Sequence, residues 1–94
     1  MLEQPSADGH AADPHGPSVL LVEDERSIAE PFASALMRSG FRTTVAHTGE
    51  EAMTLQAELQ PDVVLLDLSL PDTDGREVCR RLRLESDVPI NTRP

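Results

Sequence analysis

Acidic side chains stand directly after two short apolar segments of this chain. Residues 19–22 (Val-Leu-Leu-Val) run into Glu23 and Asp24, and residues 63–66 (Val-Val-Leu-Leu) run into Asp67. If the two segments are neighbouring strands, the three carboxylates meet at one edge of a sheet and repel one another. A divalent cation relieves that repulsion, and a set of ligands that are all oxygen atoms suits Mg²⁺. A carboxylate held beside Mg²⁺ can attack phosphorus and form an aspartyl phosphate, so the spacing indicates phosphoryl chemistry.

A plainer explanation is that these acids precede helices and are stabilised by the helix macrodipole. Glu25 fits this explanation well, because a helical pattern begins directly after it. Asp67 fits it poorly, because Leu68, Ser69 and Leu70 follow it and no helix starts there.

The elements that would position these acids alternate between two periods. Short continuous apolar runs are typical of strands covered on both faces, which predicts strands at residues 19–22 and 63–66, and residues 43–46 predict a weaker edge strand. Thr48 and Glu51 match a capping box. Helical spacing predicts three helices with the following residues turned inward: Ile28, Phe32, Ala35 and Leu36, then Ala52, Leu55 and Leu59, then Val78, Cys79 and Leu82. This order predicts an α/β fold with a parallel sheet, whose ligands bind at the carboxyl ends of the strands.

Composition narrows the possible functions. The 94 residues allow one domain, and residues 1–18, which contain three prolines and two glycines, predict a flexible leader before a domain at residues 19–94. The net charge of −9, with no lysine, disfavours direct binding to nucleic acid or anionic membranes. The single cysteine, Cys79, excludes an internal disulfide and favours a cytoplasmic setting.

Three segments in sequence order resemble the receiver domain of bacterial two-component response regulators: VLLVEDE, AHTGEEAM and PDVVLLDLSLPDTDGREVCRRLR. That family has an acidic pair after its first strand and a phosphoacceptor aspartate after its third, in a D-x-x-x-P-x-x-D-G frame. This chain matches the frame at Asp67, Pro71, Asp74 and Gly75. The resemblance covers about residues 18–90 and implies a flavodoxin-like, doubly wound parallel sheet.

The resemblance also implies roles for individual residues. Asp67 would accept a phosphoryl group from a sensor histidine kinase. Glu23, Asp24 and Asp67 would bind Mg²⁺ through their carboxylates, and Ser69 would bind it through its backbone carbonyl. Glu23 stands where the family more often has aspartate. The other motif residues are expected to serve the loop, Pro71 and Gly75 by shaping it and Asp72 and Asp74 as solvated or helix-capping acids.

Parts of the family pattern are missing. Family receivers have five strand–helix units in the strand order 2-1-3-4-5, whereas only three units are predicted here. Residues 87–90 resemble the start of a fourth strand, but residues 91–94 do not continue it, and Thr92 falls too close to Pro89 to sense the phosphoryl group. The lysine expected after a fifth strand is absent. We therefore expect a truncated receiver with an open edge at its third strand, marginal stability and impaired switching.

Two other classes of function stay open. A phosphotransfer enzyme of the haloacid-dehalogenase kind also uses an aspartate after a strand, but it wants an acid two positions later, where this chain has Ser69. A module that only binds a partner through the acidic pocket needs no phosphorylation. In each case we expect no direct binding of nucleic acid by this chain, although a longer relative could carry a DNA-binding output domain.

Overall fold

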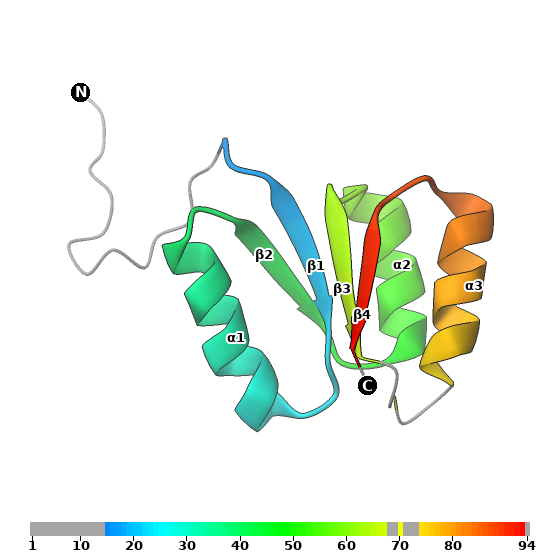
Figure 1. Cartoon of the computed structure of the whole chain (residues 1–94), viewed down its shortest axis with the longest axis horizontal. Coiled ribbons are helices and arrows are strands. Elements are labelled where there is room, and N and C mark those ends of the chain that lie inside the picture. The colour runs from blue at the N-terminus through cyan, green and yellow to red at the C-terminus, as the bar shows by residue number, and fades with distance from the viewer. Residues whose placement is uncertain (1–14, 68–69, 71–73, 94) are drawn as a thin grey trace.

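Strands and helices alternate along the chain, as predicted. The computed structural model describes residues 15–67, 70 and 74–93. Its elements are β1 (Ser18–Val22), α1 (Arg26–Arg38), β2 (Arg42–Ala46), α2 (Gly49–Leu59), β3 (Val63–Asp67), α3 (Gly75–Glu85) and β4 (Ile90–Arg93). All paired strands run parallel in the order β2-β1-β3-β4. Helix α1 lies on one face of the sheet, and α2 and α3 lie on the other (Figure 1).

The two central strands form the middle of the core. In β1, Val22 lies opposite Ala46 of β2 on one side and opposite Leu66 of β3 on the other. Leu20, Val22, Val64 and Leu66 are fully buried and pack with Val78 and Leu82 of α3 and Ala52 and Met53 of α2. Because alternate residues of a strand point to opposite faces, this row is the face that α2 and α3 cover.

A fourth strand completes the described sheet, and this corrects one expectation. Residues 91–94, of which the structure describes 91–93, were expected not to continue a strand, and the third strand was expected to have an open edge. In the structure β4 pairs with β3 in parallel, with Ile90 opposite Val64 and Arg93 opposite Asp67. The expectation was wrong because a strand at the rim needs only backbone N–H and C=O groups to pair, and any residue except proline supplies both.

The inward faces of α1 and α2 agree only in part with the predicted ones. Ala29 and Ala33 are the buried residues of α1, whereas Ile28 is 37% exposed. In α2 the prediction holds for Ala52, which is buried, and for Leu55, which packs against the core, whereas Leu59 is 43% exposed. Gly49, Met53 and Gln56 are also buried. In α1, small side chains let the helix approach the sheet closely, so packing selects the alanine stripe over the stripe with the bulkiest apolar residues. The face of α3 is as predicted, with Val78 and Leu82 fully buried and Cys79 packed against the same core.

The predicted capping box at the start of α2 is confirmed, and glycines lie at two other helix ends. Thr48 is the N-cap of α2 and its hydroxyl accepts the Glu51 N–H at 3.1 Å. Gly40, just beyond the end of α1, has φ of 98°, a conformation that glycine adopts without a steric cost. Gly75 was expected to shape the loop, but it is the buried first residue of α3, with Asp74 as the N-cap. Pro71 lies outside the described residues.

The predicted leader falls mostly outside the described residues. Its final part contacts β2, because the Arg42 backbone N–H donates to the Pro17 carbonyl at 2.8 Å and the Arg42 side chain donates to the Gly16 carbonyl at 2.8 Å. Within the described part of the chain, the helices lack the length and apolar character that crossing a bilayer requires.

Candidate functional site

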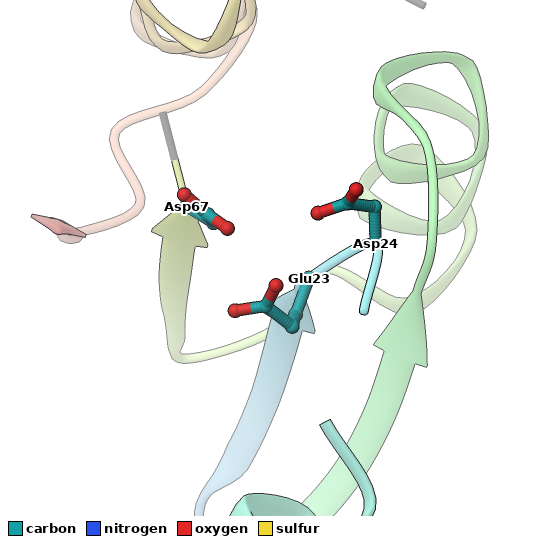
Figure 2. Close-up of side chains that lie close together, drawn as sticks. All are labelled: Glu23, Asp24 and Asp67. Carbon is teal, nitrogen blue, oxygen red and sulfur yellow. The ribbon is translucent and has the colours of Figure 1, made fainter. Parts of the chain in front are cut away.

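Glu23, Asp24 and Asp67 come together at the carboxyl edge of the sheet, as the sequence predicted. Since Val22 lies opposite Leu66 in the β1–β3 pair, the next residues along both strands are Glu23 and Asp67. One carboxylate oxygen from each of the three acids lies within 4.8 Å of the others. Figure 2 shows the three carboxyl groups turned toward the same small space.

The three acids differ in their contact with solvent. The side chains of Glu23 and Asp67 are buried, with exposures of 1% and 9%, and Asp24 is the most exposed of the three. Two carboxylates therefore stand at the floor of the site, while the third lies at its opening. This arrangement suits a cation that keeps several of its waters, because the waters can occupy the open side.

Hydrogen bonds from β2 and the following residue hold the backbone of Glu23. The Glu23 N–H donates to the Ala46 carbonyl at 2.9 Å. On the other side of the same residue, the Glu23 carbonyl lies 3.0 Å from Nδ1 of His47. The Glu25 N–H approaches Oε2 of Glu23 at 3.3 Å, so the turn also contacts the Glu23 carboxylate. The acidic pair is thus built into the hydrogen bonding of the strand ends.

The position of the acids tests the helix-macrodipole explanation. The N-cap of α1 is Glu25, whose side chain makes no capping hydrogen bond, and the first turn of α1 contains no acid. Glu23 and Asp24 lie before that N-cap and converge on Asp67. The helix end therefore accounts for the place of Glu25 at most, and it does not account for the cluster.

The remaining predicted site residues have mixed outcomes. Asp74 was expected to be a solvated or helix-capping acid. It caps α3, because its Oδ1 accepts the Arg76 N–H at 2.9 Å. Ser69 and Asp72 lie outside the described residues, so the backbone-carbonyl ligand stays a prediction. The prediction from sequence missed His47. His47 follows β2 just as Glu23 follows β1, and the parallel pairing of the two strands in the structure brings them together.

A separate hollow of about 460 Å³ lies near the other end of α2 and α3. It is lined by the C-terminal part of α2 and by the segment after α3, including Gln56, Gln60, Glu85 and Asp87. The acidic cluster contributes no residue to it. The chemistry suggested by the sequence therefore belongs to the strand ends and not to this hollow.

Comparison with known proteins identifies the class of protein. The model of the response regulator receiver domain matches residues 19–92. The DNA-binding response regulator MtrA of Mycolicibacterium paratuberculosis is 49% identical over 72 residues, which are 77% of this chain and 32% of MtrA. The BeF3-activated N-terminal receiver domain of RstA from Klebsiella pneumoniae shares the fold with a TM-score of 0.77 and 33% identity, over 80% of this chain and 64% of that one.

A CheY-like response regulator receiver domain from Methylobacillus flagellatus agrees equally well, with a TM-score of 0.77 and 30% identity over 82% of this chain and 68% of that one. The fold and the acidic edge thus define a signalling domain of two-component systems. The chain belongs to the response regulator receiver domain family. It spans about a third of the length of the curated relatives it matches.

Proposed function

We propose that this receiver domain accepts a phosphoryl group on Asp67 from a sensor histidine kinase, with Mg²⁺ bound by Glu23, Asp24 and Asp67. The observation that carries the proposal is the convergence of the three carboxylates within 4.8 Å at the carboxyl edge of the sheet. Their all-oxygen donor set fits Mg²⁺, which takes carboxylates together with waters and phosphate oxygens. Membership of the receiver family supports the same assignment.

In the proposed reaction, a carboxylate oxygen of Asp67 attacks the phosphorus of a phosphohistidine. An O–P bond forms, the N–P bond breaks, and the departing imidazole nitrogen takes up a proton from solvent. Bound Mg²⁺ would supply positive charge beside the phosphoryl oxygens. The chain's own part is positioning, because β3 fixes Asp67 in register with β1 and the buried Glu23 carboxylate stands next to it.

The roles of Ser69 and Thr92, the absence of nucleic-acid binding and the cytoplasmic setting are also proposals, and each rests on a different argument. Ser69 is retained as a backbone-carbonyl ligand on the family motif alone. Thr92 lies in β4 opposite Leu66 and not opposite Asp67, which supports the view that it does not sense the phosphoryl group. Direct binding of nucleic acid is not proposed for this chain, whose net charge is −9. A cytoplasmic setting, which would give the kinase access to Asp67, is part of the proposal.

The experiment is phosphorylation by acetyl phosphate and Mg²⁺, followed by intact mass spectrometry. We expect one phosphoryl adduct in the wild type, and we expect its loss in Asp67→Asn and in the presence of EDTA. Asp74→Asn is the matched control, because Asp74 caps α3 and asparagine is an equally good N-cap. This variant should keep the adduct.

Three results would contradict the proposal. A wild-type protein that forms no adduct under any condition is at most a binding module. An adduct that persists in Asp67→Asn places the phosphoryl group elsewhere. Catalytic turnover of small phosphate esters indicates a phosphotransfer enzyme.

A further inference from the structure

His47 connects the acidic edge of the sheet to the start of α2. Its Nδ1 lies 3.0 Å from the Glu23 carbonyl oxygen. A carbonyl oxygen can only accept a hydrogen bond, so the pairing requires that Nδ1 carry the hydrogen and donate it. Together with the bond from the Glu23 N–H to the Ala46 carbonyl, this interaction ties both backbone polar groups of Glu23 to the end of β2.

The backbone of His47 is itself held by a second set of contacts. The His47 backbone N–H donates to Oε1 of Glu51 at 2.7 Å, and the Glu51 N–H donates to the Thr48 hydroxyl at 3.1 Å. In a capping box the glutamate usually reaches back to the N-cap N–H, which here would be that of Thr48. Glu51 instead reaches one residue further, to His47. The capping interaction of α2 therefore anchors the residue whose ring holds Glu23.

The geometry has a direct consequence for the acidic pair. The Glu23 carbonyl belongs to the peptide that joins Glu23 to Asp24, so a bond to that carbonyl restricts the rotation of this peptide. The orientation of the peptide decides where both side chains leave the backbone. Both carboxylates need a fixed direction to share one cation with Asp67, which lies across the β1–β3 pair.

We propose that His47 is a positioning residue of the metal site, acting through the Glu23–Asp24 peptide and not as a ligand. This inference rests on the proposed function, because it concerns the affinity of the same cation site. Groups that orient metal ligands without touching the metal commonly change its affinity. A purely structural role for His47 predicts lower stability with no change in the affinity of the folded protein.

The test compares His47→Leu with His47→Asn. Leucine places a methyl group near the position of Nδ1, whereas asparagine places an amide N–H₂ there and can still donate to the Glu23 carbonyl. The probe is Mn²⁺ alone, whose binding is followed by the loss of its free electron paramagnetic resonance signal, with Mg²⁺ as the competitor. We expect His47→Leu to bind Mn²⁺ about three- to tenfold more weakly than the wild type, and His47→Asn to stay within about twofold of it.

A destabilised control separates positioning from stability. Val45→Ala shortens a half-buried apolar side chain of β2 that lies opposite Leu21 and has no group that could donate to the Glu23 carbonyl. Circular dichroism gives the folded fraction of every variant, and affinities are compared per folded molecule. We expect Val45→Ala to keep the wild-type affinity.

The following results would overturn the proposed positioning role of His47. Equal affinity of the wild type and His47→Leu overturns the inference and leaves the proposed function intact. Equal weakening of His47→Leu and Val45→Ala, or equal weakening of His47→Leu and His47→Asn, also overturns it. If the wild type binds no Mn²⁺, the proposed metal site is wrong, and the inference about His47 is overturned with it.

Discussion

The two central strands differ in composition from the rim of the molecule, by which we mean the edge strands β2 and β4 and the exposed face of α3. β1 and β3 carry unbroken aliphatic rows, whereas the edge strands β2 and β4 carry Arg-Thr-Thr and Asn-Thr-Arg within their sequences. The acids of the proposed site follow the central strands, and the edge strand β2 and its flanking residue contribute hydrogen bonds to them. The buried residues of a central strand fix the position of the metal-binding side chain that follows them. The comparison teaches that the core, more than the loops, sets the geometry of the acidic edge.

Exchange of one leucine in the core should show the largest difference between the two regions. Leu66 is fully buried, and Leu84 on α3 is 73% exposed. We expect Leu66→Ala to lower the free energy of unfolding by about 2–5 kcal/mol, because it removes buried methyl groups and leaves a cavity. Leu84→Ala should change it by less than about 0.5 kcal/mol. Urea denaturation followed by circular dichroism measures both.

The Leu66 exchange also bears on the metal site, because Leu66 immediately precedes Asp67. Where Leu66→Ala is still folded, its Mn²⁺ affinity should fall as well, since the strand end it holds can shift. Similar losses of stability in Leu66→Ala and Leu84→Ala would break the comparison between core and rim. They would show that the central strands are not the main source of stability.

Removal of one charge from the acidic cluster should have the next largest effect, in the opposite direction. Without a cation the carboxylates of Glu23, Asp24 and Asp67 lie close together and repel one another. We expect Asp67→Asn to raise the free energy of unfolding by about 1–2 kcal/mol in EDTA, because charges at this separation interact strongly where solvent is partly excluded. In millimolar Mg²⁺ the wild type should instead be more stable than Asp67→Asn, because Mg²⁺ stabilises the folded protein that binds it. Chemical denaturation under both conditions gives the comparison.

The rim supplies the control for this experiment. Asp74 is an acid on the exposed surface with its own role as the cap of α3. Asp74→Asn should leave the stability almost unchanged in EDTA and in Mg²⁺, because asparagine also caps a helix. If both Asp→Asn variants gain stability equally, the gain reflects the high negative charge of the whole chain and not a cluster at the strand ends.

Prediction from sequence succeeded where a physical signal is local or repeated. Unbroken apolar runs identified β1 and β3, and the parallel order then placed Glu23 and Asp67 at the same edge. The N-cap at Thr48 was readable because a hydroxyl three residues before a glutamate satisfies an otherwise unpaired helical N–H. Each of these signals depends on neighbours in the chain.

Prediction failed where the outcome depends on tertiary packing. Gln56 is polar, yet it is 5% exposed, because it continues the stripe of Ala52 and Met53 that faces the sheet. Strand β4 has no apolar run. It pairs with β3 through backbone groups, which nearly all residue types share, so the residue types do not reveal the pairing. His47 shows no pattern by itself, and its role appears only when β2 is set beside β1. These features follow from the register of the sheet, which a one-dimensional pattern does not contain.

The smallest effect is expected at the rim, in the ion pair between Glu77 and Arg80 on α3. Arg80 donates from Nη2 and Nε to the two carboxylate oxygens of Glu77 at 2.6 and 3.1 Å. This hydrogen bonding from Arg80 lowers the pKa of Glu77 below its ordinary value of 4.5. A group whose folded pKa is lowered stabilises the fold above its unfolded pKa, and this contribution disappears as the pH falls through the folded pKa.

The pH window therefore lies below 4.5, and the pair should contribute nothing measurable to the pH dependence of stability near neutrality. Arg80 is largely exposed and Glu77 is partly exposed, so solvent and salt screen their attraction. We expect Arg80→Gln to return the pKa of Glu77 toward its ordinary value in a carbon-detected NMR titration, while Arg83→Gln, one turn away from Arg80 on α3, leaves it unchanged. Because solvent screens the pair, Arg80→Gln should lower the free energy of unfolding at pH 7 only slightly, and Arg83→Gln should not change it. A clear loss of stability at pH 7 in Arg80→Gln alone would show that this part of the rim supports the fold, and the contrast with the central strands would then have to be restricted to the edge strands.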